Sequence, residues 1–86
     1  MEKIRRDYVI KTFQQLGFSE DLRELYITVL RETEFPFRRL TLPNNSDIST
    51  QLLNIYLTDL RIQAHQFYTI MGRLFPKRQP QNDKSS

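Results

Sequence analysis

Residues 46–75 read SDISTQLLNIYLTDLRIQAHQFYTIMGRLF, and this stretch decides the predicted fold. Apolar residues recur along it at steps of three and four, the spacing of one continuous helix face: Leu53, Tyr56, Leu60, Ala64, Phe67, Met71 and Leu74. It contains no proline, and its one glycine, Gly72, lies near the end. The spacing therefore predicts a single helix about 42–45 Å long, at about 1.5 Å per residue.

Two shorter helices are expected before this one. Residues 2–16 carry an apolar face and end before Gly17, which supplies the left-handed residue just past a helix. Residues 19–34 fit the helical template again, with Ser19 as the N-terminal cap and Pro36 beyond the end. The apolar stripe of this second helix consists of Leu22, Leu25, Tyr26, Val29 and Leu30.

The connection formed by residues 35–45 is the least regular part of the chain. Leu40 and Leu42 alternate with polar residues, so a short extended segment fits here, but one strand without a partner is not a sheet. Asn45 or Ser46 is expected to cap the third helix. We expect one helical domain over residues 1–76 and, after it, a disordered polar tail over residues 77–86.

The composition excludes several classes of function. The chain of 86 residues has no cysteine, which rules out disulfides, thiolate metal sites and thiol nucleophiles. His65 is the only imidazole, and two glycines leave no phosphate-cradling loop. We therefore expect no enzyme activity, no cofactor and no metal. The charged N-terminus and the lack of a long apolar run predict no signal peptide, no membrane span and a cytoplasmic location.

The length of the third helix implies a partner. The first two helices cover about half of it, and between residues 46 and 75 the only formal charges are Asp47, Asp59, Arg61 and Arg73. A helix that is apolar around much of its circumference is buried on more than one side. The prediction is an all-α, three-helix unit that assembles as a homodimeric helical bundle through Leu60, Ala64, Phe67, Met71, Leu74 and Phe75.

Two alternatives to this homodimer remain open. The long helix breaks near Asp59 and folds back as a fourth helix, or its apolar surface binds a different protein. The expected function is that of a non-catalytic, small helical regulatory or adaptor protein that acts through protein–protein interaction as a homodimer. The candidate residues for an external protein partner are Phe35, Phe37, Arg38 and Arg39, because aromatic residues and arginines are enriched at binding hot spots. The two phenylalanines could equally close one end of the core.

The alternative function is that of a nucleic-acid-binding dimer, a transcriptional regulator. Its phosphate contacts would come from the loop arginines and the basic N-terminal residues: Lys3, Arg5, Arg6, Arg38 and Arg39. A helix-turn-helix around Gly17 is disfavoured, because Phe13 is too large for the helix crossing and Glu20 and Asp21 would repel phosphates. Phosphate binding should weaken steeply with salt, whereas apolar protein recognition should hardly change.

Overall fold

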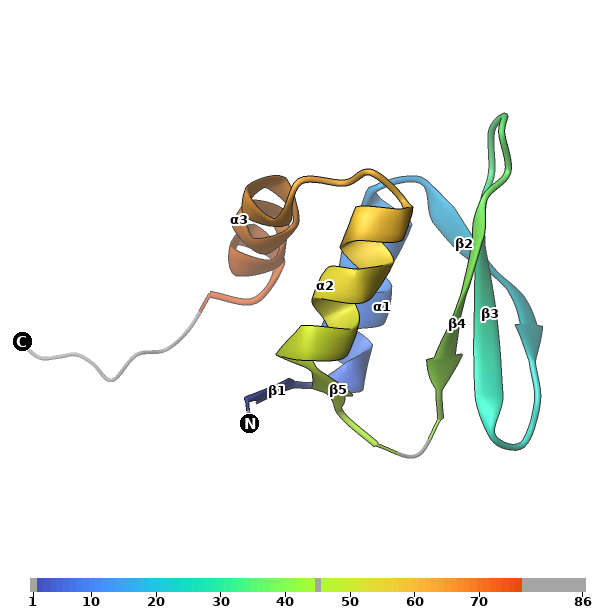
Figure 1. Ribbon diagram of the computed structural model, residues 1–86, viewed down its shortest axis with the longest axis horizontal. Helices are drawn as coiled ribbons and strands as arrows, with labels where there is room; N and C mark the ends of the chain where they lie inside the picture. Colours follow the sequence, from blue (N-terminus) through green and yellow to red (C-terminus); the bar gives the residue numbers. More distant parts are fainter. Residues whose placement is uncertain (1, 45, 77–86) are drawn as a thin grey trace, which may run out of the picture.

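A three-stranded antiparallel sheet forms one layer of the protein, and the helices lie on one side of it (Figure 1). The computed structural model describes residues 2–44 and 46–76. Its elements are, in chain order, β1 (Lys3–Ile4), α1 (Arg6–Gln15), β2 (Phe18–Arg23), β3 (Ile27–Glu32), β4 (Arg39–Pro43), β5 (Ile48–Ser49), α2 (Thr50–Asp59) and α3 (Ala64–Leu74). The prediction of an all-α three-helix unit forming a homodimeric helical bundle is therefore wrong, and the protein is a mixed α/β fold.

Residues 19–34, expected to be a helix, form most of the hairpin of β2 and β3 instead. Thr28 and Leu30 are buried, whereas Leu25 and Tyr26 of the supposed helical stripe are exposed at the hairpin turn. Burial therefore follows a period of two. The β-branched run around Thr28 favours this extended conformation, because branched side chains pack well on a pleated surface.

The short extended segment expected near Leu40 and Leu42 is β4, and its missing partner is β3. Leu40 lies opposite Leu30 and Leu42 lies opposite Thr28, so four inward side chains form one layer of the core. The strand order is β2-β3-β4, and each neighbouring pair is antiparallel.

The long third helix is two helices, α2 and α3, so the alternative of a break near Asp59 is the one found. The residue just past the end of α2, Arg61, has a left-handed backbone with φ of +58°. The amide of Arg61 donates to the carbonyl of Thr58 at 3.1 Å, and the amide of Ile62 donates to that of Leu57 at 2.9 Å. This pair of hydrogen bonds is a Schellman motif, the usual end of a helix that stops and turns.

The start of α2 is capped by Ser49, whose hydroxyl accepts from the amide of Leu52 at 3.1 Å. The cap expected at Ser46 is therefore wrong, and Asn45 lies outside the described residues. Just before the cap, β5 pairs with β1, which joins the beginning of the chain to the beginning of α2 (Figure 1). The polar tail expected for residues 77–86 also lies outside the described part of the chain.

The core lies between the sheet and the helices. Phe13 of α1 and Phe67 of α3 are fully buried, with ring centroids 4.9 Å apart, and Phe18 of β2 packs edge-on against Phe13 at 5.3 Å. The apolar face of residues 46–75 is thus covered by the chain's own sheet and by α1, and the overhang that implied a helical homodimer does not exist. The buried core residues are Val9, Ile10, Phe13, Phe18, Leu30, Leu40, Leu42, Ile48, Leu53, Leu57, Leu60 and Phe67.

Candidate functional site

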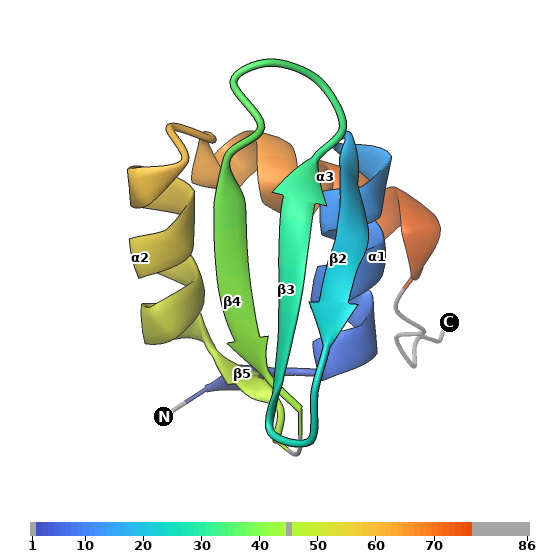
Figure 2. The same ribbon diagram turned by 90° about the vertical axis from the view of Figure 1, so that its right-hand side faces the viewer.

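One face of the three-stranded sheet is left uncovered by the described residues. Figure 2 looks onto this face, with α1 and α3 behind the strands and α2 beside β4. Since successive side chains of a strand point to opposite faces, burial of Thr28 and Leu30 places Val29 and Arg31 on the uncovered side. We call this surface the open face and define it by Ser19, Asp21, Leu22, Ile27, Val29, Arg31, Arg39 and Thr41, together with Phe35 and Phe37 of the adjoining loop.

Two arginines lie side by side on the open face. Arg31 of β3 and Arg39 of β4 are directly opposite each other in the strand register. Asp21 lies between them, with one carboxylate oxygen 3.6 Å from Nε of Arg31 and the other 3.6 Å from Nε of Arg39. Asp21 reaches this position because β2 bulges there: Glu20 pairs with Leu30 and Leu22 with Val29, which leaves Asp21 as the extra residue.

An aromatic pair extends the open face at one end. Phe35 and Phe37 lie on the β3–β4 loop, which projects beyond the sheet in Figure 2, and their rings meet edge-on at 6.3 Å. Phe35 is 86% exposed and Phe37 is 46% exposed. The guanidinium of Arg31 lies over the ring of Phe37 at 5.8 Å, so the aromatic pair and the arginine pair form one continuous surface.

The loop is held in place from the other side of the sheet by Arg38. Its guanidinium donates to both carboxylate oxygens of Glu32, at 3.0 and 2.9 Å, and to the carbonyl of Leu60 at the end of α2. This pairing lowers the pKa of Glu32 and raises that of Arg38, mainly through the hydrogen bonds between the two side chains. Arg38, expected to bind a partner, is therefore committed to the fold, while its neighbour Arg39 is on the open face.

The basic residues considered for nucleic acid do not come together. Arg6 donates to the carbonyl of Pro43 and to the side chains of Thr28 and Asn44, which ties α1 to the sheet. Arg5 pairs with Asp7 and lies over the Tyr8 ring, and these contacts with Asp7 raise its pKa. Lys3 is exposed on β1, away from the sheet. Of the five predicted residues, only Arg39 lies on the open face.

The residues expected to mediate self-association are also dispersed. Leu60 and Phe67 belong to the core, and Phe75 stacks on Tyr8 with ring centroids 4.0 Å apart. Met71 is partly buried against the core. The two remaining candidates, Ala64 and Leu74, are exposed at opposite ends of α3.

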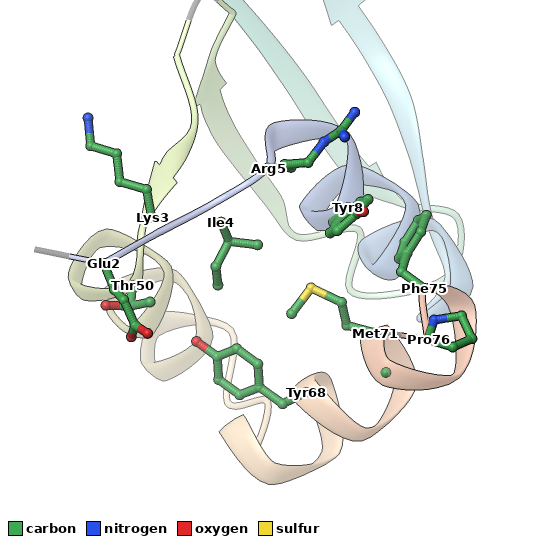
Figure 3. A pocket seen from close by; sticks show the side chains of 11 residues that line it. Glu2, Lys3, Ile4, Arg5, Tyr8, Thr50, Tyr68, Met71, Phe75 and Pro76 are labelled. Atoms are coloured by element: carbon green, nitrogen blue, oxygen red, sulfur yellow. The ribbon is translucent and has the colours of Figure 1, made fainter. Parts of the chain in front are cut away.

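Met71 and Phe75 line an open pocket of about 670 Å³ between α3, the N-terminal segment and the start of α1. The side chains of Ile4, Tyr68 and Met71 converge on it (Figure 3). Burial, together with the nearby Glu2 carboxylate, raises the pKa of Tyr68. The charged groups lie at the rim, and the walls are mostly apolar: Ile4, Tyr8, Tyr68, Met71, Phe75 and Pro76.

Arg31 is the important residue that the sequence analysis missed. It was not singled out, because it falls within residues 19–34, which were predicted to be a helix, and outside the apolar stripe of that helix. An alternating reading of residues 27–32 would have placed it on the same strand face as Val29 and, across a hairpin, beside Arg39.

Within residues 2–44 and 46–76, no group of three or more potential ligand side chains is arranged to hold a metal ion. None of the described helices is long and apolar enough to cross a membrane. Comparison with family models, with curated proteins and with solved structures finds no match to this chain.

Proposed function

We propose that this chain is a non-catalytic binding module, regulatory or adaptor in role, which recognises another protein through its open face. The observation that carries the proposal is the continuous exposed surface of Arg31, Arg39, Phe35 and Phe37 on the uncovered side of the sheet. Arginine and aromatic side chains are the types that contribute most at protein interfaces. Leu22 and Val29 continue this surface with apolar area.

The rigidity of the surface supports a role in recognition. Phe37 has a left-handed backbone with φ of +60°, and its amide donates to the carbonyl of Glu34 at 2.8 Å across a tight turn. The Glu32–Arg38 pair fixes the base of the same loop. A side chain held in a sparsely populated backbone region and exposed to solvent is pre-organised for contact, which reduces the entropy lost on binding.

The chemistry of the open face favours binding over catalysis. It carries no thiol, since the chain has no cysteine, and the only histidine, His65, is exposed on α3 behind the sheet. A general acid or base must lie within hydrogen-bond reach of its substrate, and this face offers only the arginine-paired Asp21 in that role.

A photo-crosslinking amino acid placed at Phe35 tests the proposal in cells of the organism that encodes the chain. The control places the same amino acid at Ile55, a hydrophobic residue on α2 that is 55% exposed and lies away from the open face. We expect a discrete adduct from the Phe35 position that protease removes and nuclease leaves intact, and no adduct from Ile55. Adducts only from Ile55, or none from Phe35, would refute a role for the open face.

Nucleic-acid binding by the same face is the second candidate, favoured by one observation: two adjacent arginines beside two aromatic rings on an exposed sheet. Base stacking on aromatic residues and phosphate pairing with arginine use these groups. In the crosslinking experiment this candidate predicts an adduct that nuclease removes, and binding that weakens steeply as salt rises.

A further inference from the structure

The arginine pair on the open face is an unusual arrangement for a sheet. Like charges directly opposite each other on neighbouring strands destabilise the pairing. Arg31 and Arg39 are placed in this way, and Asp21 is the one carboxylate between them. One negative charge shared by two positive charges leaves the cluster with a net charge of about +1. The cluster therefore carries one positive charge that a second carboxylate would neutralise.

The hydrogen bonding of the cluster is also incomplete. Asp21 is 3.6 Å from Nε of both arginines, which is beyond hydrogen-bond range. Nε of Arg31 is buried and has no hydrogen-bond partner among residues 2–44 and 46–76. A guanidinium presents five N–H donors in a fixed fork that matches a carboxylate. The Arg31 and Arg39 side chains are 41% and 62% exposed and form no hydrogen bond with the described residues, so their other N–H donors are open to a group arriving from solvent.

Charge elsewhere on the molecule decides between a carboxylate and a nucleic-acid backbone. A backbone needs a track of free basic residues. Among the residues that define the open face, only Arg31 and Arg39 are basic. Arg38 pairs with Glu32 at 2.9 Å on the other side of the sheet, and Arg23, opposite the buried Thr28, pairs with Glu20 at 2.9 Å. A single positive site with a carboxylate already beside it therefore favours a discrete carboxylate over a polyphosphate chain.

The neighbours of the cluster define what lies next to that carboxylate. Phe37 lies under the Arg31 guanidinium, and Phe35 lies beyond Phe37. On the other side of the arginines, Leu22 and Val29 form a cross-strand apolar pair. A partner segment that places an acidic side chain on the arginines therefore brings its adjacent side chains onto aromatic and aliphatic surface, which rewards apolar neighbours.

We propose that Arg31 and Arg39 bind a carboxylate of an acidic segment of the partner protein, one that also carries aromatic or aliphatic residues, and that Asp21 partly occupies this position in the free protein. This inference rests on the proposed function of the open face and names the chemistry of its partner. The Asp21 carboxylate competes with the incoming one, so it sets the affinity.

A fluorescent peptide provides the probe. The chain contains no tryptophan, so a short synthetic peptide of aspartate and glutamate around one central tryptophan gives a signal from the peptide alone. We expect saturable binding that weakens about tenfold or more in the Arg31→Gln, Arg39→Gln double variant. We expect Asp21→Asn to bind about threefold or more tightly, because the competing carboxylate is gone. If Asp21 only stabilised the fold, Asp21→Asn would not increase the affinity for the peptide.

Arg23→Gln is the control, because it makes the same substitution on β2 outside the arginine cluster and removes one of the two positive charges that the double variant removes. We expect it to change the affinity less than about twofold. A lysine-containing peptide with the same tryptophan should not bind. Thermal unfolding of each variant verifies that the fold is retained, and Arg31→Lys replaces the double variant if that variant unfolds.

Three results would overturn the inference: no binding of the acidic peptide, equal losses in Arg23→Gln, or tighter binding of a thymidine oligonucleotide that depends on the same arginines. The last result would assign the pair to nucleic acid. If the peptide experiment fails while crosslinking from Phe35 still yields a protein adduct, the open face binds protein by other chemistry. If crosslinking fails as well, the proposed function fails with it.

Discussion

Glu32 and Arg38 form a three-point contact across the base of the β3–β4 loop. The guanidinium donates to both carboxylate oxygens, and the backbone amide of Arg38 donates to one of them at 2.9 Å. The same guanidinium reaches the carbonyl of Leu60, at the negative end of α2. One ion pair thus joins the end of β3, the start of β4 and the end of a helix, and it positions the aromatic residues of the loop.

The pH dependence of stability should report this pair. The pKa of Glu32 is lowered in the folded protein, so its stabilisation is present above the unfolded value and is lost as pH falls through the folded value. We expect Glu32→Gln to lower the free energy of unfolding by about 1 kcal/mol at neutral pH, with a difference that shrinks as the pH falls below the ordinary glutamate pKa of 4.5. Urea unfolding of both proteins across this range measures it.

Glu34→Gln is the control for this experiment. Glu34 is exposed two residues away, and its side chain forms no ion pair with the described residues. Its replacement should leave the free energy of unfolding within about 0.5 kcal/mol of the parent at every pH. A difference between parent and Glu32→Gln that stayed constant from neutral to acid pH would show that the carboxylate charge is not responsible.

The N-terminal cap of α2 is Ser49 in the structure, whereas the sequence predicted a cap at Asn45 or Ser46. Because the Ser49 hydroxyl accepts from the amide of Leu52, Ser49→Ala should cost about 1 kcal/mol. Ser46→Ala, at the position expected to cap a longer helix, should change stability by less than about 0.5 kcal/mol. Chemical denaturation of the two variants compares them directly. The reverse order would mean that the helix begins earlier.

The turn between α2 and α3 predicts a stabilising substitution. Arg61 has φ of +58°, which costs about 1–2 kcal/mol for a residue with a Cβ and nothing for glycine. Part of that gain is offset by the greater freedom of glycine in the unfolded chain. We expect Arg61→Gly to raise the free energy of unfolding by about 0.5–1 kcal/mol.

The same chemical change at Arg73 provides the control. Arg73 lies within α3, where glycine is unfavourable, so Arg73→Gly should lower the free energy of unfolding by about 0.5–1 kcal/mol. Thermal unfolding of both variants shows whether each substitution raises or lowers the stability. A loss of stability in Arg61→Gly would contradict the Schellman ending and favour a continuous helix through this residue.

How far the sequence predicts this fold depends on local signals. The end of α1 is correct, since Gly17 has φ of +102° just past it, and the alternation around Leu40 correctly marks an extended segment. The break after α2 was only an alternative, because an arginine occupies the position where glycine normally signals the turn. Of the three predicted helical spacings, the one over residues 19–34 is wrong, and the one over residues 46–75 continues through the change of direction between α2 and α3.

The hairpin of β2 and β3 could not be derived in the same way. Residues 19–34 fit a helical stripe and do not alternate apolar with polar residues, since Thr28 is buried while Ile27 and Val29 lie on the open face. The strands are fixed by their pairing with each other and with β4. The error carried over to the candidate site. Phe35, Phe37 and Arg39 were identified because aromatic residues and arginines near a proline stand out, whereas Arg31 becomes visible only in the strand register.

The aromatic core between α1 and α3 yields the last prediction. Phe67 is fully buried, and its ring lies 4.9 Å from that of Phe13. Phe67→Ala should cost about 3–5 kcal/mol, which approaches the whole stability of a small domain. Ile55→Ala, on the exposed side of α2, should stay within about 0.5 kcal/mol.

A double-substitution cycle measures the interaction energy between the Phe13 and Phe67 side chains. Because the two rings touch, Phe13→Leu and Phe67→Leu together should cost less than the sum of the single changes, by about 0.5 kcal/mol or more. Leucine keeps the variants folded enough for urea unfolding to be measured. If Phe67 lay at an interface between two copies instead, Phe67→Asp would give a folded monomer. In this fold the same change buries an unpaired charge, and we expect an unfolded chain.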